Sequence, residues 1–148
     1  MFAAGVFGLA MIGAGPLRGQ QLELQISPQS ISFSAADPDT MPQITADRSV
    51  LVTIKVTGNR SWELTLRANG NLTNNLSVAS IDISKISWTA TSSPPFQNGI
   101  LAANVPQRGA GSNGNFNGQG ELRFVFQNLW TYLAGNYSQT VTFTLALL

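Results

Sequence analysis

The chain alternates apolar and polar residues along much of its length, most clearly over residues 137–147. Tyr137, Val141, Phe143 and Leu145 occupy one set of alternate positions there, and Ser and Thr dominate the other set. A period of two, carried by aromatic and β-branched residues, is typical of a strand with one face in a core. The pattern therefore predicts a β-strand over residues 137–147.

The same alternation predicts strands earlier in the chain. Residues 50–57 and 61–67 both alternate and are separated by a short Gly-Asn turn, a pattern that favours a β-hairpin. Residues 21–26 and 31–33 also alternate, with Pro28 between them. Because proline cannot donate a ladder hydrogen bond, these two runs predict a first strand interrupted by a kink.

A change of parity marks one bend. Ile81 and Ile83 lie on odd positions, whereas Ile86 and Trp88 lie on even ones. Since both pairs can face one core only if the register shifts, a bulge or bend is expected near residues 84–85.

Three stretches carry turn and loop signals. Residues 36–47 contain two prolines and are expected to be a loop. Residues 91–98 contain Pro94 and Pro95, so they are not expected to form a central strand. Residues 104–120 are rich in glycine and asparagine and hold few apolar residues. We expect this stretch to be a long loop between residues 100–101 and a strand over residues 122–127.

Seven to nine strands without helices predict an all-β domain over residues 21–148. The expected architecture is an antiparallel immunoglobulin-like β-sandwich, with a jelly roll as the alternative. The predicted core consists of the inward-facing members of the alternating runs: Val50, Val52, Ile54, Val56, Trp62, Leu64, Leu66, Ile83, Trp88, Leu122, Phe124, Phe126, Val141, Phe143 and Leu145.

Residues 1–20 differ from the rest of the chain because they begin with a continuous run of apolar and small residues. The run ends near Gly15 and is shorter than the ~20 residues that span a bilayer, so no stable membrane span is expected. Its length fits an export signal, cleaved between Gly15 and Gln21. The alternative is a retained segment that packs against its own fold or against another subunit.

Composition narrows the possible functions. The chain has no histidine and no cysteine, which removes the ordinary nucleophile–base pairs and the imidazole and thiolate metal sites. Charged residues make up only 10% of the chain, against the usual ~25%, and its eight Lys and Arg residues are scattered. Nucleic-acid binding needs clustered basic residues, so we expect none.

The acidic residues offer little catalytic chemistry. Glu23, Glu63 and Glu121 fall on outward positions of predicted strands, as expected for solvated carboxylates. A glycosidase built on two of the acids is the remaining enzymatic alternative, but we expect a protein that is not an enzyme and needs no cofactor. A bound calcium ion is the alternative to the absence of a cofactor, because one loop contains three carboxylates, Asp37, Asp39 and Asp47.

Aromatic residues outside the alternating runs are candidates for ligand contact. Trp130 and Tyr132 precede the last strand, and Phe116 lies in the expected loop. Exposed rings stack on sugar faces or anchor protein partners, whereas rings folded back would cap the sandwich. Both interpretations stay open for Trp130, Tyr132 and Phe116.

Three segments resemble bacterial secreted immunoglobulin-like β-sandwiches, including pilins without cysteine and WxL-like surface domains. They are residues 27–34, the strand around Trp62, and residues 134–145. The resemblance implies an extracellular or cell-surface structural or adhesive protein, such as a fimbrial filament subunit. It also implies homo-oligomers, or assembly with other surface proteins.

In such filaments, an N-terminal strand of one subunit completes the sheet of the next. Leu22, Leu24 and Ile26, or the apolar run before Gly15, are the candidates for such a strand. The alternative function is a carbohydrate-binding module that meets glycans through its exposed rings.

Overall fold

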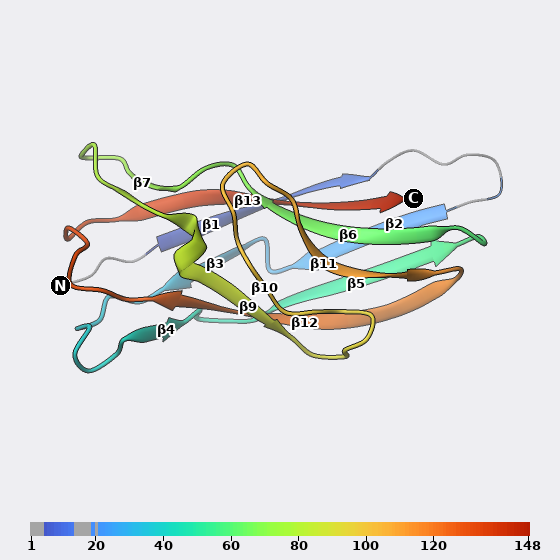
Figure 1. Cartoon of the computed structure of the whole chain (residues 1–148), viewed down its shortest axis with the longest axis horizontal. Helices are drawn as coiled ribbons and strands as arrows, with labels where there is room; N and C mark the ends of the chain where they lie inside the picture. Colours follow the sequence, from blue (N-terminus) through green and yellow to red (C-terminus); the bar gives the residue numbers. More distant parts are fainter. Residues whose placement is uncertain (1–4, 14–18, 20) are drawn as a thin grey trace.

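Two β-sheets stacked face to face form the molecule (Figure 1). The computed structural model describes residues 5–13, 19 and 21–148. The all-β sandwich expected from the alternating pattern is confirmed. The described chain has more strands than the seven to nine expected, because several short strands extend the sheets at their edges.

The first sheet contains seven strands. Its main path runs in the order β11 (Gln107–Asn113), β6 (Ser61–Ala68), β13 (Tyr137–Leu147), β1 (Gly5–Gly13) and β3 (Ser30–Phe33). Two short strands extend it: β7 (Leu72–Asn74) pairs with β13, and β8 (Ser80–Ile81) pairs with β7.

The second sheet contains six strands. Its main path runs in the order β10 (Gly99–Ile100), β9 (Ile86–Ala90), β12 (Phe116–Gln127), β5 (Val50–Thr57) and β2 (Gln21–Ser27), with β4 (Gln43–Thr45) paired to β12. A 3₁₀ turn, η1 (Ile83–Lys85), leads into β9.

The strand order matches the immunoglobulin arrangement. In that fold the first, second, fifth and fourth strands form one sheet, and the third, sixth and seventh form the other. Here β2, β5, β12 and β9 form the four-strand sequence of the second sheet, and β6 and β13 are neighbours in the first. The place beside β13 that the seventh strand takes in an immunoglobulin domain is filled by β1.

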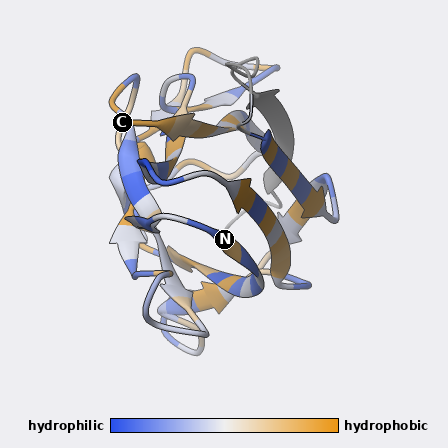
Figure 2. Ribbon diagram, turned by 90° about the vertical axis from the view of Figure 1, so that its right-hand side faces the viewer, coloured by the Kyte–Doolittle hydropathy of each residue, from blue (hydrophilic) through white to orange (hydrophobic). Residues whose placement is uncertain are grey.

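The core lies between the sheets, where alternate residues point inward. All fifteen predicted core residues are buried, including Trp62 and Trp88. Bands of hydrophobic and hydrophilic residues alternate along the strands in Figure 2. The strand predicted over residues 137–147 is β13 with the same bounds. Alternation located these residues because it directly encodes which face of a strand is buried.

The predicted hairpin of residues 50–57 and 61–67 is wrong in its pairing. Both strands exist as β5 and β6, but β5 pairs with β2 and β12 in the second sheet, whereas β6 pairs with β11 and β13 in the first. The turn between them crosses from one layer to the other. Two alternating strands bury one face each in either geometry, so the pattern does not distinguish a hairpin from a crossing between layers.

The long loop expected over residues 104–120 is also wrong. This stretch forms β11 and the beginning of β12, which again lie in different sheets. The space above its strand glycines is filled by large side chains: a Cβ on Gly120 would lie 2.5 Å from the Phe96 ring, and one on Gly118 would lie 2.8 Å from Phe116. Glycine is required there because rings pack directly on the backbone.

Two of the remaining local expectations are wrong. The first strand expected to kink at Pro28 is two separate strands, β2 in the second sheet and β3 in the first, so the chain crosses between the layers there. The bend expected near residues 84–85 is η1, where the Asp82 carboxylate accepts the Ser84 backbone N–H at 2.8 Å. Residues 91–98 form no strand beyond an isolated bridge at Phe96. Residues 36–47, expected to be a loop throughout, include β4, which adds three residues to the edge of the second sheet beside β12.

We expect Gly120→Ala to destabilise the domain by about 1–3 kcal/mol, because the added methyl group overlaps the buried Phe96 ring. Denaturant unfolding followed by tryptophan fluorescence measures this. Gly111→Ala is the matched control, because its Cβ would meet only the movable end of the Arg108 side chain. Equal losses in the two variants would contradict the packing explanation.

Candidate functional site

The position between β13 and β3 in the first sheet is the candidate functional site, and we call it the slot. β1 fills the slot with nine register pairs to β13, from Gly5–Tyr137 to Gly13–Leu145. On its other side, β1 makes four register pairs with β3. The backbone of β1 therefore joins two strands that are not otherwise neighbours in the sheet.

The register aligns every second residue of β1 with buried positions of its neighbours. Leu9 is the partner of Val141 and Met11 is the partner of Phe143, both of them core residues. On the β3 side, Phe7 is the partner of Ile31, which is 2% exposed. Register partners share one face of a sheet, so these positions of β1 are in register with the core rows of β13 and β3.

β1 runs parallel to β13, unlike the other named strand pairs in the described chain, which are antiparallel. The seventh strand of an immunoglobulin domain is antiparallel to its neighbour. β1 therefore occupies that strand's place in the reverse direction. Parallel ladders are slightly less stable per residue than antiparallel ones.

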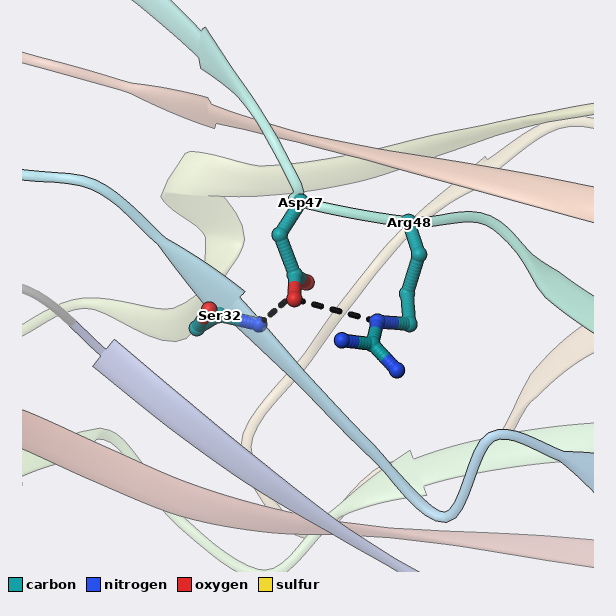
Figure 3. A network of polar contacts seen from close by, with 3 residues as sticks. All are labelled: Ser32, Asp47 and Arg48. Carbon is teal, nitrogen blue, oxygen red and sulfur yellow. Dashed lines mark hydrogen bonds and ion pairs between the residues drawn. The ribbon is translucent and has the colours of Figure 1, made fainter.

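Asp47 holds β3 in place through hydrogen bonds (Figure 3). β3 is the strand that borders the slot on the side opposite β13. Its carboxylate accepts the backbone N–H of Ser32 at 2.8 Å, and its own backbone N–H donates to the Ser32 carbonyl at 2.8 Å. The Arg48 guanidinium donates to the same carboxylate at 3.1 Å. A strand of four residues is thereby held by a group outside the sheet.

The hydrogen bond from Ser32 is the main reason that the pKa of Asp47 lies below its ordinary value. Partial burial opposes this shift, and the positive charge of Arg48 adds to it. A lowered pKa in the folded state means that the carboxylate contributes stability above pH 4, where it is ionised in the unfolded chain as well. That contribution is lost as the pH falls through the folded-state pKa.

We expect Asp47→Asn to lower the free energy of unfolding by less than about 1 kcal/mol at pH 7, because the carboxylate is 37% exposed. The variant should also lose less stability than the parent between pH 5 and 2. Urea unfolding at several pH values measures both effects. Arg48→Ala should keep most of the acid dependence, since Ser32 supplies the larger effect. Parallel pH profiles for Asp47→Asn and the parent would contradict this role of Asp47.

The other assembly candidates lie in the second sheet. Leu22, Leu24 and Ile26 belong to β2, which pairs with β5 along its whole length. Ile26 is buried, whereas Leu22 and Leu24 are half-buried against the core. Outside the core rows, Glu23 and Lys55 form an ion pair at 3.5 Å. β2 is thus an edge strand built into its own domain.

The loop end of the sandwich, at the left of Figure 1, gathers loops 34–42, 75–79 and 128–136. Asn128 ties two of these loops together, since its side-chain amide donates to the carbonyls of Ala36 and Met41, at 3.1 Å each. The Tyr137 hydroxyl donates to the Leu133 carbonyl at 2.9 Å and fixes the start of β13.

The three candidate aromatic residues occupy different environments. Trp130 is 56% exposed, and its indole N–H donates to the Asp39 carboxylate at 2.8 Å. It borders a hollow of about 540 Å³ with Ala35, Ala36 and Asp37. Only Trp130 of the three presents an exposed ring.

Tyr132 and Phe116 are half-buried and pack on the core, at opposite ends of the sandwich. The Tyr132 ring lies 5.8 Å from the Phe126 ring, and burial, with a smaller effect of the Asp82 charge, raises the pKa of its hydroxyl. The Phe116 ring lies 5.1 Å from that of Trp62. Phe116 also borders a shallow hollow with Lys55 and Asn115.

The acidic residues of the predicted calcium loop do not converge. The Asp37 carboxylate accepts the Asp39 backbone N–H, Asp39 accepts from Trp130, and Asp47 is engaged with β3. Within the described ranges, no group of three or more acidic residues is placed to hold a metal ion.

Exposed apolar side chains at the loop end were not anticipated. Leu76 and Val78, between β7 and β8, are almost fully exposed. Leu133, three residues after Trp130, is 67% exposed. Their flanking Asn and Ser residues are the signal in the sequence that predicts a solvated turn.

Searches against models of known protein families and among curated proteins find no match to this chain. Among the described residues, no helix has the length and apolar character needed to cross a membrane.

Proposed function

We propose that this chain is an extracellular structural or adhesive protein, a filament subunit whose copies join by strand complementation at the slot. The observation that carries the proposal is that the place beside β13 is filled by β1, a strand from a distant part of the sequence. β1 is held in the slot by backbone hydrogen bonds and is joined to the rest of the domain at one end only. A neighbouring copy can therefore supply such a strand as well as the same chain can.

The surface supports a role in contact between copies. Charged residues make up only 10% of the chain, so like-charge repulsion between copies is weak. The proposal requires that residues 5–13 stay in the exported protein. The cleavage predicted between Gly15 and Gln21 falls largely among residues outside the described ranges.

Leu9→Asp is expected to abolish assembly, because its register partner Val141 is buried and an uncompensated carboxylate in that row costs several kcal/mol. Ala10→Asp is the matched control, since its partner Thr142 is not a core residue. Electron microscopy and sedimentation of the purified proteins measure assembly, and circular dichroism checks the fold.

Equal assembly of Leu9→Asp and Ala10→Asp would contradict strand complementation through β1. A parent protein that forms no filaments would overturn the proposed function. So would a mass for the exported protein that shows the loss of residues 5–13.

A carbohydrate-binding role is the second candidate, and the exposed Trp130 ring beside its hollow favours it. An indole face stacks on the apolar face of a sugar ring. The hydrogen bond to Asp39 holds the ring in one orientation, so it is ready for such a contact.

Trp130→Ala is expected to reduce retention on an insoluble neutral polysaccharide at least tenfold while leaving the melting temperature unchanged. Leu133→Ala, another exposed apolar residue of the same loop, should be retained like the parent. Affinity chromatography on cellulose and chitin measures this. A parent protein that passes through both columns would reject the second candidate.

A further inference from the structure

We propose that the outer edge of β2 is a second contact surface, which takes the β2 strand of another copy in antiparallel register. Two molecules related by a two-fold axis would then join their second sheets into one continuous sheet. This contact lies outside the slot and involves no exchange of strands. The pair forms whether or not copies also join at the slot.

One side of the sandwich is closed by the chain itself. β11 is the edge strand of the first sheet on that side, and residues 95–97 run along it. The Gln97 backbone N–H donates to the Gly109 carbonyl at 2.9 Å, and the Gly111 N–H donates to the Pro95 carbonyl at 3.2 Å. β10, the edge strand of the second sheet beside β11, has only two residues. Covered and short edges offer little to a partner strand.

The opposite side of the sandwich is open at β2. In the first sheet, the Ser32 N–H and C=O of the edge strand β3 are both bonded to Asp47. β1 extends past β3 over residues 9–13, so the first sheet does not close this side along its whole length. In the second sheet, the seven residues of β2 pair with β5 on one side, and among the described residues no backbone group pairs with them on the other. β2 therefore presents a long row of backbone donors and acceptors to a partner.

The inward side chains of β2 show that the core row is incomplete at this edge. Each of them is paired with a residue of β5 that is at most 2% exposed. Ile26 is buried as well, whereas Leu22 and Leu24 are half-buried at the border of the core. A second β2 strand would place inward-facing side chains beside both leucines and bury them further.

The sequence of β2 selects one register for such a pair. Directly opposite residues share one face of a sheet, so inward residues must meet inward residues. With Leu24 on the two-fold axis, all seven residues of each strand find a partner, and Leu22 lies opposite Ile26. A shift that puts Glu23 on the axis would oppose two carboxylates. A shift that puts Gln25 on the axis would leave two residues of each strand without a partner.

The charges on the outward face fit the same register. Glu23 would lie opposite Gln25 of the other copy, which is neutral. The charge of Glu23 is already compensated within its own chain, since the Lys55 ammonium lies 3.5 Å from the carboxylate and the Gln21 side-chain amide donates to it at 2.6 Å. β2 carries no other charge and no proline, two features that keep edge strands apart. The edge is therefore compatible with a copy of itself.

Gln25→Lys and Gln25→Glu test the register with opposite signs. In the pair, each substitution places a new charge opposite Glu23 twice, so the first should lower the dissociation constant about tenfold and the second should raise it about tenfold. Sedimentation velocity over a range of concentrations measures this. Thr89→Lys and Thr89→Glu are the controls, because they change the net charge equally on the outward face of β9, three strands away from β2.

A single cysteine on the two-fold axis reports the geometry directly, because the chain contains no cysteine of its own. Leu24→Cys places the two substituted positions opposite each other with Cα atoms about 5 Å apart, within disulfide distance. Leu22→Cys is the matched control, also half-buried on β2, but the two copies of position 22 lie four residues apart, roughly 13 Å along the strands. Under mild oxidation, Leu24→Cys should give about tenfold more dimer than Leu22→Cys on a non-reducing gel.

Dissociation constants that ignore the sign of the charge at position 25 would overturn the inference, and so would equal cross-linking of Leu24→Cys and Leu22→Cys. A parent protein that sediments as a monomer at every concentration, with a Leu24→Cys variant that forms no dimer, would overturn it as well. Filaments are a separate measurement. Their absence rejects the proposed function, and a Leu24→Cys dimer in that case still supports the β2 pair.

Discussion

The pairing of β13 with a strand on each side is the interaction on which the rest of the structure depends. Seven register pairs join β13 to β6 and nine join it to β1, while Val141, Phe143 and Leu145 lie in the core. A strand directs its backbone N–H and C=O groups to both sides, so half of those of β13 depend on the occupant of the slot. The identity of that occupant connects the stability of the domain to its assembly.

The alternating pattern was sufficient to predict the strands that show it, such as β5, β6 and β13, and fifteen core residues, but it did not predict which strands pair. β5 and β6 illustrate this, because each buries every second residue and yet they belong to different sheets. The glycine-rich β11 and the start of β12 escaped detection for a different reason. Glycine takes inward positions there because side chains from other segments cover the backbone: Phe96 lies above Gly120 in β12, and Leu66 lies above Gly109 in β11.

The candidate site could be predicted only in part. The sequence placed Trp130 between strands but left its exposure open, since Tyr132 of the same loop packs on the core. Its contact with Asp39 spans 91 residues of sequence. The hold of Asp47 on β3 is a similar long-range contact. The continuous run of small and apolar residues that forms β1 fits an export signal and also fits a strand paired on both sides in a sheet, so the sequence alone did not decide between them.

The scarcity of charge has a consequence for the conditions in which the protein works. The two ion pairs of the described residues, Asp47–Arg48 and Glu23–Lys55, both lie on the surface, where dissolved ions screen them. The core rows and the backbone ladders contain no charge that salt could weaken. Screening of charges by salt should therefore change the stability of this sandwich very little.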